Sequence, residues 1–395
     1  MTSEPGEPAR DSGMPATAYL VVGEDSGDAL GAELVTALRA LAPGIGFRGT
    51  AGRRMRELGL SSLFDIDDIA VMGLAGVAAR LPLLLRRIRQ VAADVVASRP
   101  DVLVLIDSPD FNHRVARRVR RKLPDLPIVK YVCPSVWAWR PGRAAAMRGH
   151  IDHVLALLPF EPKVLEELGG PEATYVGHPL TRRLSDAGRG GGRSKPGETP
   201  VLAVLPGSRR SEIRLLLPEI RDTLALMADR GTRFRAVLPA VPHLEEEIRA
   251  EVAGWPVKPE IVSGEAAKHE LFSTADAALA ASGTVLLELA LYRVPTLSIY
   301  RVDWLMHTFR FLVTGWTAAL PNLICDDTIV PERIGEFVRP GWLARALEGL
   351  MREGSARQAQ LDGFAEMARI LETDVPAGEI AARKVLEMAL QKKAA

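Results

Sequence analysis

The chain has 395 residues, of which 47% are hydrophobic and 25% charged, and its formal net charge is +1. These values are ordinary for a soluble globular protein, and they predict two or three domains at roughly 150 residues per domain. The near-neutral charge gives no compositional support for a nucleic-acid partner. No apolar run approaches the ~20 residues needed to span a bilayer, so we expect any membrane contact to be peripheral.

The two cysteines, Cys133 and Cys325, lie far apart in the sequence. This arrangement fits a reducing compartment and supplies neither a CxxC motif nor a metal cluster. Residues 1–16 are rich in Pro, Glu, Ser and Gly and lack the apolar core of a signal peptide, so we predict a disordered start. We therefore expect a cytoplasmic protein without a metal site or a cofactor.

In residues 17–185, short apolar runs alternate with longer helical patterns, which indicates an α/β domain with a parallel sheet covered by helices on both faces. Strands are predicted at Ala18–Val22, Val102–Ile106, Ile128–Val132 and Val154–Leu157. Helices are predicted at Asp28–Leu41, Arg80–Ser98 and Phe111–Leu123.

Residues 186–198 include three consecutive glycines, which is typical of a linker or an exposed loop. The alternation then restarts over 199–340, which predicts a second Rossmann-like domain, and 341–395 reads as helical only. Strands are predicted at Val201–Leu205, Arg235–Leu238, Ile261–Val262, Ala277–Ala280 and Thr296–Ile299. Helices are predicted at Ser211–Ala228, Leu244–Val252, Ala267–Thr274 and Thr284–Leu291.

Ligands of open parallel sheets bind beyond the carboxyl ends of the strands, so the loops at these ends are the candidate sites. After the first strand, the loop carries Glu24, Asp25, Ser26 and Asp28 beside two glycines. Its three acids oppose a bare phosphate, so we favour sugar or acceptor hydroxyls as their partners and place Ser26 and Asp28 on the acceptor side. Ser26 or Asp28 can cap the next helix; the alternative is a capped turn with solvated acids.

Asp107 and Asp110 follow the apolar strand Val102–Ile106. An acid at the tip of a central strand is well placed to act as a general base, because the strand fixes its position, and burial could raise its pKa toward useful values. We expect this role for Asp107 and a helix-capping role for Asp110. The alternative is that both acids are caps.

Ser135, Trp137 and Trp139 lie in the loop after Ile128–Val132, beside a proline and an arginine. Two tryptophans in such a loop are uncommon, and we place Ser135 and Trp137 on the acceptor side. Core packing is the alternative for the tryptophans.

In the second domain, Gly207, Ser208 and Arg209 follow the first strand at a strand-to-helix turn. Free N–H groups of the helix start and the charges of Arg209 and Arg210 suit a pyrophosphate, and Ser211 is a candidate cap. The alternative is a solvated basic turn.

A second turn of this kind, Ser282–Thr284, precedes Glu288. The small residues Ser282, Gly283 and Thr284 free the N–H groups of a helix start, and Glu288 can accept hydrogen bonds from ribose hydroxyls one turn later. The alternative for Glu288 is an exposed helix acid.

Asp65-Ile66-Asp67 formally matches the DxD pattern of metal-dependent sugar transferases. It lies in a loop before an apolar segment rather than at a strand end, so we do not expect a metal there. His113 and His178 are isolated from other potential metal ligands in the sequence.

The helix Arg80–Ser98 carries an apolar stripe that we expect to face the core. The stripe consists of Leu81, Leu84, Leu85, Ile88, Val91 and Val95. Apolar side chains and arginines outside the stripe suit an interface with acidic lipid headgroups. These membrane candidates are Met72, Leu74, Val77, Leu83, Arg86 and Arg87, and Trp304–Val313 is a second apolar segment. Ordinary core with solvated arginines is the alternative.

Nine short motifs occur in one order along the chain. They are Gly23–Asp28, Ala70–Gly73, Ile106–Asn112, Pro134–Trp139, Leu158–Glu161, Val176–Pro179, Pro206–Arg209, Ala281–Thr284 and Leu320–Asn322. Each is weak alone, but the series from about Ala18 to Asn322 resembles the lipid-A-disaccharide synthase family.

This resemblance implies a GT-B glycosyltransferase fold, in which two Rossmann-like domains face a cleft and the C-terminal helices cross back to the first domain. It also implies the donor UDP-2,3-diacylglucosamine, the acceptor 2,3-diacylglucosamine 1-phosphate, and peripheral contact with the anionic inner face of the cytoplasmic membrane during lipid A biosynthesis. No catalytic metal is implied. A homodimer is compatible with the sequence.

Carried over by motif, Asp107 resembles the catalytic base and Glu24 a residue of the acceptor-side cleft. Arg209, Glu288 and Asn322 would hold the UDP part. The chain departs from the family pattern at Asp25, where a small Ala is usual, and at Cys133, where Ser is common. It departs again at 323–327, where two acids replace a usual Gly-Arg pair.

The expected reaction is an inverting transfer, in which Asp107 takes the proton of the acceptor's 6-hydroxyl, and Arg209 and helix N–H groups stabilise the departing UDP. The alternatives are another UDP-sugar enzyme of this fold, either a soluble-acceptor transferase or an epimerase, and a non-catalytic UDP-sugar-binding protein. An NAD dehydrogenase is disfavoured, because no GxGxxG follows the first strand.

Overall fold

The structure is a computed structural model that describes residues 16–69, 74–181, 196–301 and 315–394. The predictions for residues 1–15, for Met72, for most of the linker 186–198 and for the whole of Trp304–Val313 lie outside these ranges, as do the side chains of Leu74 and Val77. Within them, no helix combines the length and apolar character needed to cross a bilayer.

The chain forms two compact units. The first comprises residues 1–179 and 373–395, and the second comprises 180–372. Each unit contains a six-stranded sheet in which every neighbouring pair of strands is parallel. The prediction of two α/β halves with parallel sheets is confirmed.

The sheet of the first unit has the order β2-β1-β3-β4-β5-β6. Its strands are β1 (Thr17–Val21), β2 (Gly46–Gly49), β3 (Val102–Ile106), β4 (Ile128–Tyr131), β5 (His153–Ala156) and β6 (Glu172–Tyr175). Its helices are α1 (Asp25–Leu41), α2 (Arg53–Glu57), α3 (Leu74–Ser98), α4 (Pro109–Arg120), α5 (Arg143–Met147), α6 (Glu161–Glu167) and α16 (Ala377–Ala394).

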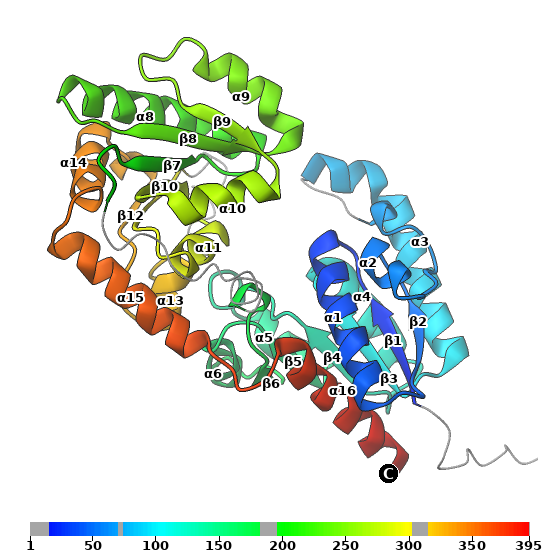
Figure 1. Cartoon of the computed structure of the whole chain (residues 1–395). Coiled ribbons are helices and arrows are strands. Elements are labelled where there is room, and N and C mark those ends of the chain that lie inside the picture. The colour runs from blue at the N-terminus through cyan, green and yellow to red at the C-terminus, as the bar shows by residue number, and fades with distance from the viewer. Residues whose placement is uncertain (1–15, 70–73, 182–195, 302–314, 395) are drawn as a thin grey trace, which may run out of the picture. The chain divides into compact units, whose positions relative to one another are not determined.

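Successive residues of a strand point to opposite faces of the sheet, and β1 shows how this builds two core layers. Ala18 and Leu20 pack with buried side chains of α1 and α16, whereas Tyr19 and Val21 pack with those of α3 and α4. Helices therefore cover both faces of the sheet (Figure 1). Strands buried on both sides read as continuous apolar runs, which is why β3 was predicted with its observed bounds.

The sheet of the second unit has the order β12-β11-β10-β7-β8-β9. Its strands are β7 (Val201–Leu205), β8 (Arg235–Ala240), β9 (Glu260–Ser263), β10 (Ala277–Ala281), β11 (Thr296–Tyr300) and β12 (Glu332–Ile334). Its helices are α8 (Arg210–Asp229), α9 (Glu245–Val252), α10 (Glu265–Thr274), α11 (Val285–Leu291), α13 (Leu320–Cys325), α14 (Pro340–Leu350) and α15 (Ser355–Leu371). Buried side chains of α8, α9 and α14 share one core with the sheet.

The C-terminal helices divide differently from the predicted block 341–395. Helices α14 and α15 belong to the second unit, and only the segment from Thr373 onward, which contains α16, belongs to the first. Ala381, Ala382 and Val385 of α16 are fully buried in the core that α1 and β1 share. Of the C-terminal helices α14, α15 and α16, only α16 therefore belongs to the first unit.

Candidate active site

Asp107 and Ser108 follow β3 directly, and both have left-handed backbone angles, with φ of 51° and 39°. Two successive non-glycine residues in this region are strained and persist only where their surroundings hold them. The Asp107 amide donates to the Tyr131 carbonyl at 3.0 Å, and the Asp107 carbonyl accepts from the Asn112 side chain at 2.8 Å. Hydrogen bonds to both the amide and the carbonyl of Asp107 therefore fix the backbone at the tip of the strand.

The Asp107 carboxylate is oriented through both of its oxygens. Ser26 Oγ donates to Oδ2 at 2.8 Å, and the Ser108 amide donates to Oδ1 at 2.9 Å. Because β1 pairs with β3, the loops after these two strands lie side by side. This pairing brings the predicted residues Glu24, Ser26 and Asp107 together.

Glu24 is the second carboxylate of this cluster, and its Oε1 accepts from Ser108 Oγ at 3.4 Å. Burial raises the pKa of Glu24, and the neighbouring Asp107 carboxylate raises it further. The close approach of the loops needs a glycine before Glu24, since a Cβ on Gly23 would lie 2.6 Å from Ser108 Oγ.

Lys130, which is not among the predicted site residues, is completely buried beneath this cluster. Its Nζ donates to the main-chain carbonyl of Asp107 at 2.5 Å, and to those of Tyr131 and Leu105 at 3.2 and 3.4 Å. Burial lowers the pKa of Lys130 to about 8, against the opposing effect of Asp107. The available signal was a lysine within the otherwise apolar run 128–133.

Asp28 binds the start of a different helix from the one that we expected it to cap. It is buried, and its two carboxylate oxygens accept from the backbone amides of Arg54 and Met55 at 2.7 and 3.2 Å. The predicted cap of the following helix by Ser26 or Asp28 is wrong, because α1 begins after Glu24 without a side-chain cap. Asp28 instead holds the start of α2, and its acceptor-side role stays a prediction.

The expected cap at Asp110 is also wrong. Residue Ser108 is the N-cap of α4, which has no side-chain cap, and Asp110 is 91% exposed and forms an ion pair with Arg143 at 3.4 Å.

Trp137 is anchored in the first unit by polar and aromatic contacts. Its Nε1 donates to Glu161 Oε1 at 3.2 Å, and its ring meets Phe160 edge-on with centroids 5.5 Å apart. Burial raises the pKa of Glu161 to about 7. Ser135 lies exposed in the same loop. Of the two predicted acceptor-side residues here, Ser135 is therefore the more accessible.

A cavity of about 330 Å³ adjoins the carboxylate cluster, with Glu24 and Ser108 in its lining. Leu81, Leu84 and Leu85 of α3 line it as well, and Leu81 is 43% exposed. The expectation that this whole stripe faces the core is therefore wrong. The core takes its C-terminal part, Ile88, Val91 and Val95, while the three leucines face the cavity beside Glu24.

In the second unit, the predicted phosphate turn lies between β7 and α8. Gly207 has φ of 107°, and a Cβ there would lie 2.6 Å from Glu212 Oε2. Arg209 is the N-cap of α8, and its amide donates to Glu212 at 3.4 Å while its guanidinium pairs with Glu212 at 2.7 Å. The predicted cap at Ser211 is wrong, because Glu212 takes that role. Ser208 is exposed, and the Arg209 side chain remains 70% exposed.

The turn after β10 lies next to this one, because β10 pairs with β7. Ser282 Oγ donates to the Ala318 carbonyl at 3.1 Å, Gly283 has φ of 152°, and Thr284 precedes α11 and is exposed. Glu288 is mostly buried and pairs with Lys268 at 3.0 Å, so the reading of an exposed helix acid is wrong.

Asn322 is buried, and its side-chain amide forms four hydrogen bonds within the second unit. Its Oδ1 accepts from the amides of Ile329 and Val330 at 3.0 and 2.7 Å, and its Nδ2 donates to Thr317 Oγ1 and the Val330 carbonyl at 3.2 and 2.9 Å. These four bonds hold the segment 327–330 in place. A direct contact of Asn322 with UDP stays a prediction.

Among the predicted membrane residues with described side chains, Leu83 is half-buried and Arg86 is exposed. Arg87 is engaged inside the unit, where it pairs with Asp68 at 2.5 Å and stacks over the Phe64 ring at 4.7 Å.

No group of three or more potential metal ligands occurs in the part of the chain that the structure describes. Asp65 of the DxD-like triplet accepts from the Asp67 amide at 3.2 Å and so closes a local turn. His113, isolated in the sequence, has a histidine partner in the fold: its Nδ1 lies 3.1 Å from Nε2 of His150.

Comparison with solved structures gives the fold a name. A Staphylococcus aureus MnaA–UDP co-structure has a TM-score of 0.62 at 12% identity and covers 94% of this chain and 95% of its own. Acinetobacter baumannii MurG has a TM-score of 0.55 at 13% identity, with coverage of 94% and 99%. These similarities show the fold alone, and the predicted GT-B fold is confirmed.

Sequence relatives are much closer. A lipid-A-disaccharide synthase of Rhodopseudomonas palustris is 48% identical over 376 residues, covering 92% of this chain and 94% of the relative. One from Bradyrhizobium diazoefficiens is 44% identical over 378 residues, with coverage of 95% and 96%. Residues 18–380 match the family model described as lipid-A-disaccharide synthetase, and the chain therefore belongs to that family of glycosyltransferases.

Proposed function

We propose that the chain transfers a diacylglucosamine unit from UDP-2,3-diacylglucosamine to the 6-hydroxyl of 2,3-diacylglucosamine 1-phosphate and releases UDP. Family membership supports this reaction. The structural observation that carries it is the pair of carboxylates, Glu24 and Asp107, held at the adjacent tips of β1 and β3.

Asp107 is the proposed general base. Its carboxylate takes the proton of the acceptor hydroxyl while the hydroxyl oxygen bonds to the anomeric carbon of the donor. The bond from that carbon to the diphosphate oxygen breaks, and its electron pair leaves with UDP, which inverts the anomeric centre. The bonds from Ser26 and Ser108 fix the carboxylate's direction, and this orientation favours one attacking geometry.

The negative charge that develops on the diphosphate needs positively polarised partners. The second unit offers the exposed guanidinium of Arg209 and the amides at the start of α8, a helix of 20 residues. Glu288, kept in place by Lys268, is the proposed partner of the ribose hydroxyls.

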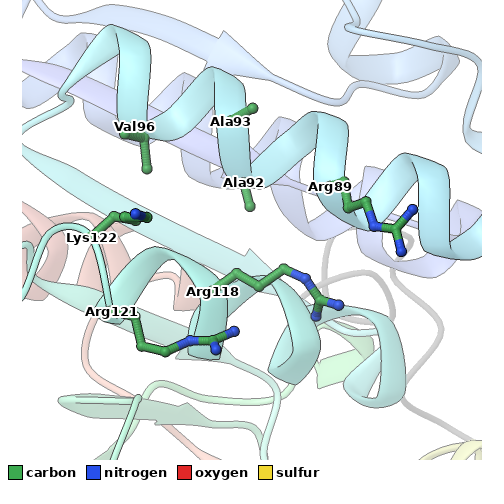
Figure 2. Close-up of a pocket in the computed structure, with 7 residues that line it drawn as sticks. All are labelled: Arg89, Ala92, Ala93, Val96, Arg118, Arg121 and Lys122. Atoms are coloured by element: carbon green, nitrogen blue, oxygen red, sulfur yellow. The ribbon is translucent and has the colours of Figure 1, made fainter.

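Peripheral contact with an anionic membrane is part of the proposal. Arg86 is exposed on α3, and a groove of about 650 Å³ runs between α3 and α4 (Figure 2). Its lining consists of the basic residues Arg89, Arg118, Arg121 and Lys122 and the apolar residues Ala92, Ala93 and Val96. Basic side chains around a small apolar floor suit acidic lipid headgroups.

The decisive experiment replaces the proposed base. Asp107→Asn keeps the side chain's size but removes its basicity, so turnover should fall by about 10²- to 10⁴-fold, the usual contribution of a general base. UDP release from the diacylated donor and acceptor is measured in detergent micelles. Asp222→Asn is the matched control, because Asp222 is an exposed surface carboxylate paired with Arg221.

The control should retain wild-type turnover, and omission of the acceptor should abolish UDP release. Near wild-type turnover in folded Asp107→Asn would refute the assignment of the base. UDP release that needs no acylated acceptor would refute the reaction itself.

A further inference from the structure

The first unit contains another cavity, of about 210 Å³, bounded by α4 and by the segment from Arg140 to His150 that contains α5. Four arginines line it: Arg114, Arg117, Arg140 and Arg143. None of the nine family motifs includes these arginines, and no step of the proposed reaction uses them. A concave site with four guanidinium groups needs an explanation beyond packing.

The cavity has a strong excess of positive charge. Among the described residues that line it, Asp110 is the one carboxylate, and it pairs with Arg143 at 3.4 Å. Arg140 stacks over the Trp139 ring at 5.2 Å, a contact that orients the guanidinium without neutralising it. Four arginines against one carboxylate leave a local surplus of positive charge, which favours an anion.

A histidine pair completes the wall. His113 and His150 are buried, and a single hydrogen bond of 3.1 Å joins them. Burial lowers the pKa of His113 to about 3 and that of His150 to about 4, with further lowering by nearby arginines, so both rings are neutral at pH 7. The shared bond uses one ring N–H, and the other ring N–H remains available as a donor.

These groups match one ligand chemistry. Guanidinium forks donate two parallel hydrogen bonds to phosphate oxygens, and a neutral imidazole N–H can donate a further one. A phosphate monoester carries nearly two negative charges at pH 7. Its oxygens act mainly as hydrogen-bond acceptors. The cavity offers donors and positive charge, which is the complementary arrangement.

The position of the cavity connects it to the carboxylate cluster. Asp110 and Arg114 line this cavity and also the 330 Å³ cavity whose lining includes Glu24 and Ser108. Arg114 comes five residues after Pro109, which places it about 7.5 Å along the axis of α4 from the end of the Asp107 loop. One sugar phosphate could therefore present a hydroxyl at Asp107 and its phosphate to Arg114 and its neighbours.

We propose that the arginine cavity binds the phosphate monoester of the acceptor sugar and so selects a phosphorylated acceptor. This inference rests on the proposed function, because it assigns the acceptor's phosphate to a site in the same unit as the base. The donor's diphosphate remains assigned to the second unit.

The test is the double variant Arg114→Gln/Arg117→Gln, whose two side chains extend from α4 into the cavity. Arg369→Gln/Arg383→Gln is the matched control, because both of these arginines are exposed and pair only with a neighbour on their own helix. Turnover is measured in nonionic detergent with the phosphorylated acceptor and with the same sugar lacking its phosphate. Unchanged thermal unfolding verifies that the variants are folded.

We expect the KM for the phosphorylated acceptor to rise at least ~10-fold in the cavity variant, since a hydrogen bond to a charged group contributes a factor of that order or more. The kcat should change far less, and the KM for the donor should not change. Wild-type protein should prefer the phosphorylated acceptor, and the cavity variant should lose that preference. An unchanged KM in the folded variant would overturn the proposal.

Inorganic phosphate supplies a readout that does not depend on turnover. Titration of the wild-type protein should shift the NMR signals of the His113 and His150 rings, and the cavity variant should show no such shift. If the variant instead loses only its binding to vesicles of anionic lipid, with its acceptor KM intact, the site serves lipid headgroups and the proposal is wrong. Absence of UDP release by the wild-type protein would refute the proposed function, while the phosphate titration would still decide whether the cavity binds phosphate.

Discussion

Lys130 is a charged side chain in the interior of the first sheet, where its ammonium group reaches three main-chain carbonyls, including that of Asp107. It holds the strained turn from beneath and contacts no exposed surface. We infer that Lys130 positions the base, and that its positive charge also moderates the repulsion between Asp107 and Glu24.

Replacement by methionine should separate these effects. Lys130→Met keeps the length of the side chain but removes its donors, so we expect kcat to fall ~10-fold or more with little change in donor KM. The acidic limb of the pH–rate profile should move to higher pH, because Glu24 loses a neighbouring cation that lowers its pKa. Lys163→Met is the control, since Lys163 is an exposed lysine on α6 paired with Glu167. Equal losses in both variants would contradict the inference.

The same residue predicts a pH dependence of stability. The pKa of Lys130 is about 8 in the folded chain, against an ordinary 10.5, so the unfolded chain binds more protons between these values. Stability should therefore rise from pH 8 to 10.5 through this group, by about 3 kcal/mol at 1.36 kcal/mol per pKa unit. Urea unfolding of wild type and Lys130→Met across this window measures the difference, and parallel curves would exclude the effect.

At the scale of the elements, Asp28 links two helices, since it lies in α1 and accepts from the first amides of α2. Asp28→Ala should destabilise the protein by about 1–2 kcal/mol, the usual effect of losing a helix cap, with added cost because the amides are buried. Urea unfolding measures the change, and Asp25→Ala, at an exposed position of α1, is the control. Unchanged stability with lost activity would instead support the acceptor-side role predicted from the sequence.

Prediction from sequence succeeded for elements whose signal is local. The central strands β3 and β7 are buried on both faces, and their apolar runs gave the observed bounds. The strands β2, β6 and β12 were missed because each is a short edge strand without such a run. Edge positions impose weaker demands on composition, so the sequence carries less information about them.

The site residues likewise divide into those that a local sequence signal predicted and those that it did not. Asp107, Glu24 and Ser26 were found because each follows a recognisable strand. Contacts between distant residues left no local signal: Asp28 caps a helix 26 residues later, and His113 meets a partner 37 residues away. The helix caps at Asp110 and Ser211 were wrong because a capping residue type beside a helix start does not determine where its side chain points.

At the scale of the whole molecule, the two units have separate sheets and separate cores. The last helix, α16, belongs to the core of the first unit although 193 residues of the second precede Thr373. Because each core closes on itself, we expect two unfolding transitions in calorimetry. Val385→Asp places a charge in the first core and should lower only one of them, while Leu347→Asp in α14 should lower only the other.

Adding UDP should then show which of the two unfolding transitions comes from the unit that binds the nucleotide. A ligand that binds only the folded form stabilises it by RT ln(1 + [L]/Kd), about 2.7 kcal/mol at a hundredfold excess over Kd. We expect UDP to raise the transition that Leu347→Asp lowers and to leave the other unchanged. Arg209→Gln should reduce this upward shift, since its guanidinium is the proposed partner of the diphosphate. A shift of the transition sensitive to Val385→Asp would instead place the nucleotide on the first unit and contradict the division of roles between the two sheets.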